Sequence, residues 1–216
     1  MEEVVAMDTR RPLAIVTPTL DGDVLTRLAL AEASFTPGQL QRLLPDASVA
    51  GVRRVLKRLS AQGIVIATPV GDAAVTYSLN REHVGANAII ELAQQATTVR
   101  HRISAELEGW KYPPRYAAIF GSWARGEATT SSDIDLFLVR PRDVSGDEWD
   151  DQVGALERSV WRWTGNDARS LVVDEDRVSG AAEEPVLTDV LREGLALYGS
   201  QEWFRKAVRL SARTGT

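Results

Sequence analysis

The sequence predicts an α/β (α+β) protein in which helices and a small hairpin precede a mixed sheet flanked by helices. Three observations predict it. Apolar residues at helical spacing and N-cap residues precede two β-rich runs that end at Asn80. A single apolar stripe at helical spacing follows. From Tyr116 onward, strand-like and helix-like runs alternate. We therefore expect a helical domain at 1–80, a linker helix at 81–114 and a sheet-containing domain at 115–216.

The composition is that of an ordinary globular chain, with 216 residues of which 44% are hydrophobic and 25% charged. No apolar run approaches the roughly 20 residues of a membrane span, and the N-terminus lacks a secretory apolar region, so we expect a cytoplasmic protein without a membrane partner. Cysteine is absent and only two histidines occur. Disulfides and thiolate sites are therefore excluded, and oxygen atoms are the expected ligands for any metal.

Three short helices are predicted in the first region. "DVLTRLALAEA" has apolar residues at helical spacing, with Asp21 or Asp23 as the expected N-cap. "TPGQLQRLLP" begins with Thr36 as its cap, and "SVAGVRRVLKRLSAQG" begins at Ser48 and ends at Gly63.

A hairpin follows, because "IVIATPV" and "AAVTYSLN" are β-rich runs around a Gly-Asp turn. Three helices and a hairpin between Asp23 and Asn80 resemble a winged helix-turn-helix domain, which implies DNA binding. From residue 24 to residue 81 there are seven basic and three acidic residues, a net charge of +4 in a chain of net charge −5. The expected DNA-binding residues lie on the third helix and are Arg53, Arg54, Lys57 and Arg58. A protein-binding role for this domain stays open.

The linker carries one apolar stripe from Ile89 to Leu107, which predicts a single long helix that ends before Pro113. In the last region, "YAAIF", "DIDLFLV" and "ARSLVV" are predicted strands, and "LALY" is a candidate edge strand. "DEWDDQVGALERSVWRWTG" is predicted to be an amphipathic helix that ends at Gly165.

Two acids interrupt one of these apolar strands. Asp133 and Asp135 face the same side of "DIDLFLV", about 7 Å apart along the strand, and two neighbouring anions repel each other unless a cation lies between them. Carboxylate oxygens at this separation suit Mg²⁺, which binds one or two carboxylates together with substrate phosphates.

A glycine-serine turn precedes the acids. Gly121 allows a close backbone approach after the strand "AAIF", and Ser122 offers a hydroxyl group next to backbone N–H groups that can bind an anion. A phosphate-binding turn about a dozen residues from a metal-binding acid pair is typical of a site for a nucleoside triphosphate and its metal.

These elements together, "GSWARGEATTSSDIDL", resemble the signature of the minimal nucleotidyltransferases of the polymerase-β-like superfamily. The resemblance extends from Tyr116 through roughly a hundred residues and implies a polymerase-β-like nucleotidyltransferase domain. The matching positions are Gly121, Ser122, Arg125, Gly126, Ser132, Asp133 and Asp135. The resemblance assigns Asp133 and Asp135 to catalysis and metal binding, and it assigns nucleotide binding to Gly121, Ser122, Arg125 and Ser132.

The family supplies a third carboxylate from a later strand, here "NDARSLVVDED". Asp167 at its start is the first candidate for this catalytic and metal-binding role, and Asp174 at its end is the second. A third alternative is that the position lacks an acid, so that the domain binds nucleotide without turnover.

The resemblance implies transfer of a nucleoside monophosphate from an NTP, with ATP expected, to a hydroxyl group, assisted by two Mg²⁺ ions. The acceptor is expected to be a small molecule or a protein, such as the toxin partner of a toxin–antitoxin pair. The rival hypothesis is a DNA-binding regulator, or an antitoxin-like protein, whose nucleotidyltransferase domain only binds nucleotide. The oligomeric state stays open.

Overall fold

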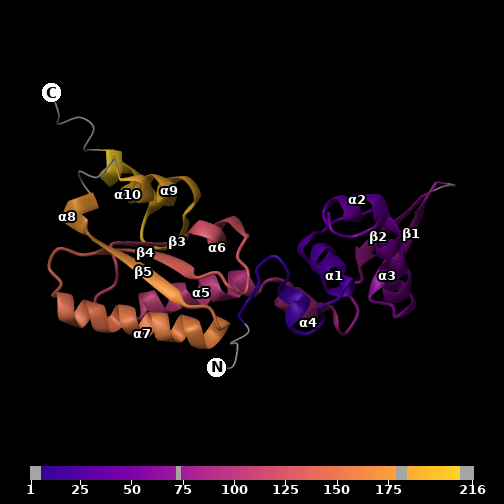
Figure 1. Cartoon of the computed structure of the whole chain (residues 1–216), viewed down its shortest axis with the longest axis horizontal. Coiled ribbons are helices and arrows are strands. Elements are labelled where there is room, and N and C mark those ends of the chain that lie inside the picture. The colour runs from indigo at the N-terminus through magenta and orange to yellow at the C-terminus, as the bar shows by residue number, and fades with distance from the viewer. Residues whose placement is uncertain (1–5, 72–73, 179–183, 210–216) are drawn as a thin grey trace. The chain divides into compact units, whose positions relative to one another are not determined.

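A computed structural model describes residues 6–71, 74–178 and 184–209 of the chain. The chain divides into two compact units (Figure 1). The N-terminal unit is Arg11–Gln95, and the C-terminal unit combines the segment up to Arg10 with the chain from Ala96 onward. In the part of the chain that the structure describes, no helix combines the length and apolar character that crossing a membrane requires.

The N-terminal unit consists of helices and one antiparallel hairpin. Its elements are η1 (Pro12–Ile15), α1 (Leu20–Leu30), α2 (Pro37–Arg42), α3 (Val49–Ala61), β1 (Val65–Val70), β2 (Ala74–Leu79) and α4 (Ala86–Ala93). Thr36 caps α2 by accepting a hydrogen bond from the Gln39 N–H, and Ser48 caps α3 by accepting one from Gly51, which confirms both predicted caps.

The cap predicted for the first helix was wrong. The helix α1 begins at Leu20 after Thr19, so Asp21 and Asp23 lie within its first turn. Carboxylates are also favourable there, because the positive end of the helix dipole lies at the N-terminus.

The single linker helix predicted over residues 81–114 is two helices. The first, α4, ends before Gln94, whose backbone leaves the helical region (φ −96°, ψ 15°), and α5 (Gln95–Glu108) follows. Their apolar residues belong to different cores. Those of α4 pack with α1 and α3, whereas Val99, Ile103 and Leu107 of α5 pack in the C-terminal unit. One apolar stripe in the sequence therefore serves two cores.

The C-terminal unit is built on a mixed four-stranded sheet, as the sequence predicted. The strand order is β5-β4-β3-β6, in which β3 is antiparallel to β4 and β6 and β4 is parallel to β5. The remaining elements are β3 (Tyr116–Phe120), α6 (Gly121–Arg125), β4 (Ile134–Arg140), α7 (Gly146–Thr164), β5 (Ala168–Asp174), α8 (Glu175–Val178), α9 (Pro185–Glu193), β6 (Leu195–Tyr198) and α10 (Gln201–Arg209).

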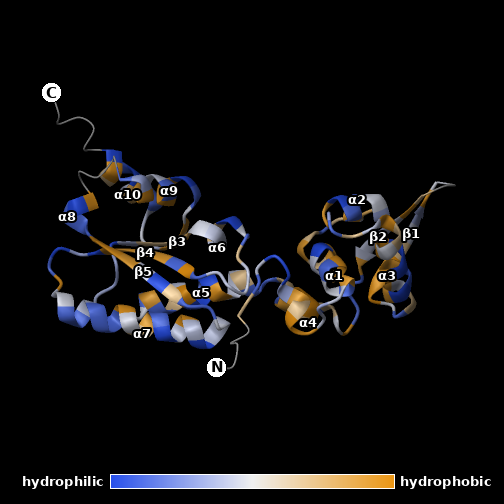
Figure 2. Ribbon diagram, viewed as in Figure 1, coloured by the Kyte–Doolittle hydropathy of each residue, from blue (hydrophilic) through white to orange (hydrophobic). Residues whose placement is uncertain are grey.

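Helices cover both faces of this sheet: α5 and α7 lie on one face, and α8, α9 and α10 lie on the other (Figure 1). The helix α7 alternates hydrophilic and hydrophobic residues along its length, as a helix with one covered side does (Figure 2). The alternation predicted for β4 is confirmed, because Leu136 packs toward α5 and α7, whereas Phe137 packs toward α9 and α10. Asp135 therefore lies on the face of β4 that carries Phe137.

A buried asparagine connects the N-terminal segment to the start of β4. Asn166 is 2% exposed; its side-chain oxygen accepts a hydrogen bond from the Met7 N–H (3.0 Å), and its amide group donates to the Ser132 carbonyl (2.9 Å). Ser132 directly precedes Asp133, so this side chain holds the backbone from which the acid pair extends.

We predict that Asn166→Ala lowers the free energy of unfolding of the C-terminal unit by about 2–3 kcal/mol, because it leaves buried donors and acceptors without partners. The matched control is Asn80→Ala in the other unit, where the hydrogen bond from the side chain to the Gly63 carbonyl is exposed. The control is expected to cost about 1 kcal/mol or less. Urea unfolding followed by tryptophan fluorescence measures the cost of Asn166→Ala, because all six tryptophans lie in the C-terminal unit, and far-ultraviolet circular dichroism measures the cost of the control. Equal costs for the two variants would contradict the role of Asn166.

Candidate functional site

The β3–α6 turn brings Gly121 against Asp135. Phe120, the last residue of β3, pairs with Asp135 in the register of β3 and β4, and Gly121 follows with φ +69°. A Cβ atom at residue 121 would lie 2.7 Å from the Asp135 Oδ2. Glycine is therefore required here both for the backbone conformation and for the approach of the carboxylate.

The two acids lie at the start of β4, as predicted. Asp133 directly precedes Ile134, the first residue of the strand, and Asp135 is half-buried. Burial raises the pKa of the Asp135 carboxyl, since it removes the charged form from water, and the Asp133 carboxylate raises this pKa further. Arg169 and Arg125 oppose both effects but do not cancel them.

This acid pair fits a divalent cation. Two carboxylates that repel each other and raise the pKa of the more buried one are stabilised by a cation between them. Oxygen donors on one strand face match the requirements of one Mg²⁺ ion that also contacts phosphate oxygens.

Ser132, predicted to contact the nucleotide, is part of the turn that precedes the acids. Its hydroxyl oxygen accepts a hydrogen bond from the Thr129 N–H (3.0 Å), and its own N–H donates to the Thr129 carbonyl (3.0 Å). The Ser132 carbonyl also accepts a hydrogen bond from the Asn166 side chain, so the backbone that precedes Asp133 is held in place.

Arg125, also predicted to contact the nucleotide, is held by two acids. Its Nε donates to Glu127 (2.8 Å) and its Nη1 donates to Glu193 (2.7 Å). Glu193 is the last residue of α9 and is largely buried, so this ion pair ties α9 to α6. Sequence reasoning missed Glu193, which lies 68 residues away from Arg125 in the chain.

The two candidates for a third carboxylate lie at opposite ends of β5. Asp167 is exposed; its backbone carbonyl accepts the hydrogen bond of the Ile134 N–H, and its side chain lines a shallow cavity beside Trp161 of α7. Asp174 lies at the opposite end of the strand pair, where it accepts hydrogen bonds from Arg140. Over the described ranges, no three His, Cys, Asp or Glu side chains are grouped so that they could hold a metal ion.

A cation, Arg169, lies beside the acid pair on β5, the strand on which a third acid was expected. The register of β4 and β5 places Arg169 beside Asp135, and the Arg169 Nη1 is 2.9 Å from the Asp133 Oδ2. The sequence contained one signal for this cation, because Arg169, Leu171 and Val173 are spaced two apart and so share one face of the predicted strand. The register of the two strands could not be derived from the sequence.

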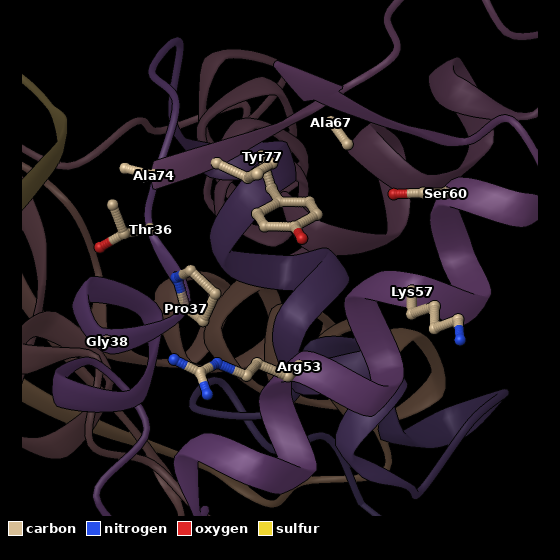
Figure 3. A pocket seen from close by; sticks show the side chains of 10 residues that line it. Thr36, Pro37, Gly38, Arg53, Lys57, Ser60, Ala67, Ala74 and Tyr77 are labelled. Atoms are coloured by element: carbon tan, nitrogen blue, oxygen red, sulfur yellow. The ribbon is translucent and has the colours of Figure 1, made fainter. Parts of the chain in front are cut away.

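The predicted DNA-binding residues lie in the other unit, on α3. Arg53 and Lys57 line an open cavity of about 710 Å³ between α2, α3 and the hairpin, and Tyr77 and Pro37 lie across from them (Figure 3). The hydroxyl-bearing residues Thr36 and Ser60 also line it. The cavity thus presents two cationic side chains, and cationic groups bind phosphate oxygens.

The other two basic residues of α3 point elsewhere. Arg58 forms an ion pair with Asp21 of α1, so part of its charge is compensated within the unit. Arg54 is exposed and does not line the cavity. The structure therefore separates the four predicted residues into a cavity-lining pair and a second pair.

We predict that Gly121→Ala weakens Mn²⁺ binding about tenfold or more, because the added methyl group displaces the Asp135 carboxylate that it contacts. Gly126→Ala is the matched control, since Gly126 has nearly the same φ (+68°) but nothing within 4 Å of an added Cβ. Both substitutions are expected to cost about 1 kcal/mol of stability through the backbone. Isothermal titration with Mn²⁺ separates them, and equal affinities would contradict the contact.

The region around the acid pair is similar to a known protein family. Residues 107–178, about a third of the chain, match the family described as a nucleotidyltransferase domain. No curated protein matches the chain.

Several solved structures share a weak likeness with the chain. A toxin–antitoxin complex with AMP-PNP has a TM-score of 0.40 at 18% identity, covering 52% of this chain and 83% of that chain. The MntA–HepT toxin–antitoxin complex has a TM-score of 0.37 at 16% identity, covering 54% and 83%. A tri-AMPylated Shewanella oneidensis HEPN toxin in complex with MNT antitoxin has a TM-score of 0.37 at 15% identity, with the same coverages. With TM-scores this low, the similarity on which a function can be proposed is the match of residues 107–178 to the nucleotidyltransferase domain family.

Proposed function

We propose that the C-terminal unit transfers a nucleoside monophosphate from an NTP, with ATP as the expected donor, to a hydroxyl group. The observation that carries this proposal is the position of Asp133 and Asp135 on one face of β4, with Asp135 against the glycine turn at Gly121. The match of residues 107–178 to the nucleotidyltransferase domain family supports it.

In the reaction the acceptor oxygen bonds to the α-phosphorus, and the bond from this phosphorus to the bridging oxygen breaks. Pyrophosphate leaves with that electron pair, and the hydroxyl proton passes to water. Bound Mg²⁺ would supply neutralisation of the phosphate charge. Asp133 and Asp135 would hold the ion. The backbone at Gly121 and the Ser122 hydroxyl would orient the triphosphate, since small groups there allow a close approach.

Arg125 has a positioning role in this proposal. Its guanidinium joins Glu127 and Glu193, and it is near enough to Asp135 to oppose the rise of that residue's pKa. Arg125 would thus hold α9 next to the turn that carries Ser122, while its charge still acts on the acid pair.

We predict that Asp133→Asn combined with Asp135→Asn lowers Mg²⁺-dependent NMP transfer at least about 100-fold, because the electrostatic stabilisation of the transition state is lost. Asp150→Asn, which removes an exposed acid of α7, is the control and should retain activity. The assay adds labelled ATP and Mg²⁺ to a lysate of the source cells. Label in a polypeptide identifies a protein acceptor, such as a toxin partner, and label in the small-molecule fraction identifies a small one. Transfer that survives the double substitution would contradict the assignment.

A second candidate function is nucleotide binding without turnover, in a DNA-binding regulator. The observation that favours it is that, within the described ranges, no third acid is grouped with Asp133 and Asp135 so that it could hold a metal ion. Calorimetric titration of ATP with Mg²⁺, followed by a pyrophosphate assay, discriminates between the two. Binding with pyrophosphate release supports transfer, and binding without release supports the regulator.

We further propose that the N-terminal unit is a winged helix-turn-helix that binds the DNA backbone at the cavity lined by Arg53 and Lys57. Each phosphate contact adds about 0.9 to the slope of log affinity against log salt concentration. Arg53→Ala should therefore lower this slope by about one. Arg42→Ala is the control, because Arg42 is exposed on α2 and does not line the cavity. Fluorescence anisotropy with duplex DNA at several salt concentrations measures both, and identical slopes would contradict the proposed surface.

A further inference from the structure

The cation of the acid site comes from the neighbouring parallel strand. Residues that pair in the register of β4 and β5 lie on the same face of the sheet, so Arg169 shares the face of Asp135. Its guanidinium reaches the other acid, with 2.9 Å between the Arg169 Nη1 and the Asp133 Oδ2. The backbone register therefore puts a cationic side chain directly beside both carboxylates.

Arg169 forms its ion pair with an acid of the pair itself. Arg125, the other guanidinium that acts on Asp135, has Glu127 and Glu193 as partners. Among the ion pairs of the described residues, Arg169 appears only with Asp133. Arg169 is thus the cation that contacts the acid pair directly.

An arginine at this place has chemical consequences for metal binding. A guanidinium has no lone pair for a metal, keeps its charge at every physiological pH and repels a second divalent cation. A two-metal site needs a further carboxylate grouped with the pair, and among the described residues no third His, Cys, Asp or Glu is grouped with these acids so that it could hold a metal ion. The residues present fit one divalent ion and do not fit two.

We propose that Arg169 occupies the place of a third metal ligand, so that the acid site holds one divalent ion and uses the guanidinium as its second positive charge. This inference rests on the proposed nucleotidyl-transfer function. With nucleotide absent, Arg169 neutralises Asp133. With the metal-bound triphosphate present, the guanidinium remains beside the acids as a fixed charge for the phosphate oxygens.

The test counts Mn²⁺ ions by electron paramagnetic resonance with a saturating non-hydrolysable ATP analogue. The wild-type chain is expected to bind one ion, and Arg169→Asp, which installs a carboxylate beside the pair, is expected to bind two. Arg42→Asp is the control: it makes the same charge change on the exposed surface of α2 and should still bind one ion.

Arg169→Gln keeps the inference testable if the aspartate variant does not fold. It removes the ion pair without adding a ligand, so nucleotide-free Mn²⁺ should bind about two- to fivefold more tightly, as expected for the loss of a largely exposed competing pair. The ion count with the analogue should remain one.

The outcomes separate this inference from the function on which it rests. Two ions on the wild-type chain, or one ion on both aspartate variants, would overturn the role of Arg169 and leave nucleotidyl transfer standing. The same holds for unchanged nucleotide-free affinity in Arg169→Gln. Failure of the wild-type chain to bind Mn²⁺ with the analogue would overturn both.

Discussion

Electrostatic repulsion between two carboxylates on one strand face is the constraint around which the C-terminal unit is organised. Carboxylates such as Asp133 and Asp135 do not stabilise an apolar sheet, and burial disfavours the charged form of Asp135. The structure places a glycine against Asp135 and an arginine against Asp133. It also holds the backbone before Asp133 through a buried asparagine, so the acids keep their place although they repel each other.

The supporting contacts come from segments far apart in the chain. Asn166 links the N-terminal segment at Met7 to the turn before β4, and Glu193 links α9 to α6 through Arg125. The same unit thus buries its N-terminal segment and its late helix α9 against the elements that carry the site. Sites that depend on a pre-organised acid pair need such supporting contacts, since a small displacement of one ligand weakens metal binding.

Local signals in the sequence predicted the local parts of this arrangement. The caps Thr36 and Ser48, the strand "YAAIF" and the opposite directions of Leu136 and Phe137 follow from residue type and period alone. The break at Gln94 could not be predicted, because the apolar stripe is continuous and only tertiary packing assigns its halves to different cores.

The ion-pair partners of the site residues could not be predicted from the sequence either. The Arg169–Asp133 pair depends on the register of two parallel strands, and the Arg125–Glu193 pair depends on the packing of α9. Sequence reasoning singled out the acid pair and the glycine turn and missed the residues that hold or neutralise the acids. It also looked for a third acid along one strand, where the register presents a cation beside the pair.

The central claim is that Asp133 and Asp135 together bind the metal ion of a metal-bound triphosphate beside Gly121. A crystal structure with Mn²⁺ and a non-hydrolysable ATP analogue, with data collected at the manganese absorption edge, tests it most directly. The account predicts an anomalous peak within ligand distance of both carboxylates and phosphate density next to the turn at Gly121 and Ser122. Triphosphate density elsewhere, or no anomalous signal at the acid pair, would contradict it.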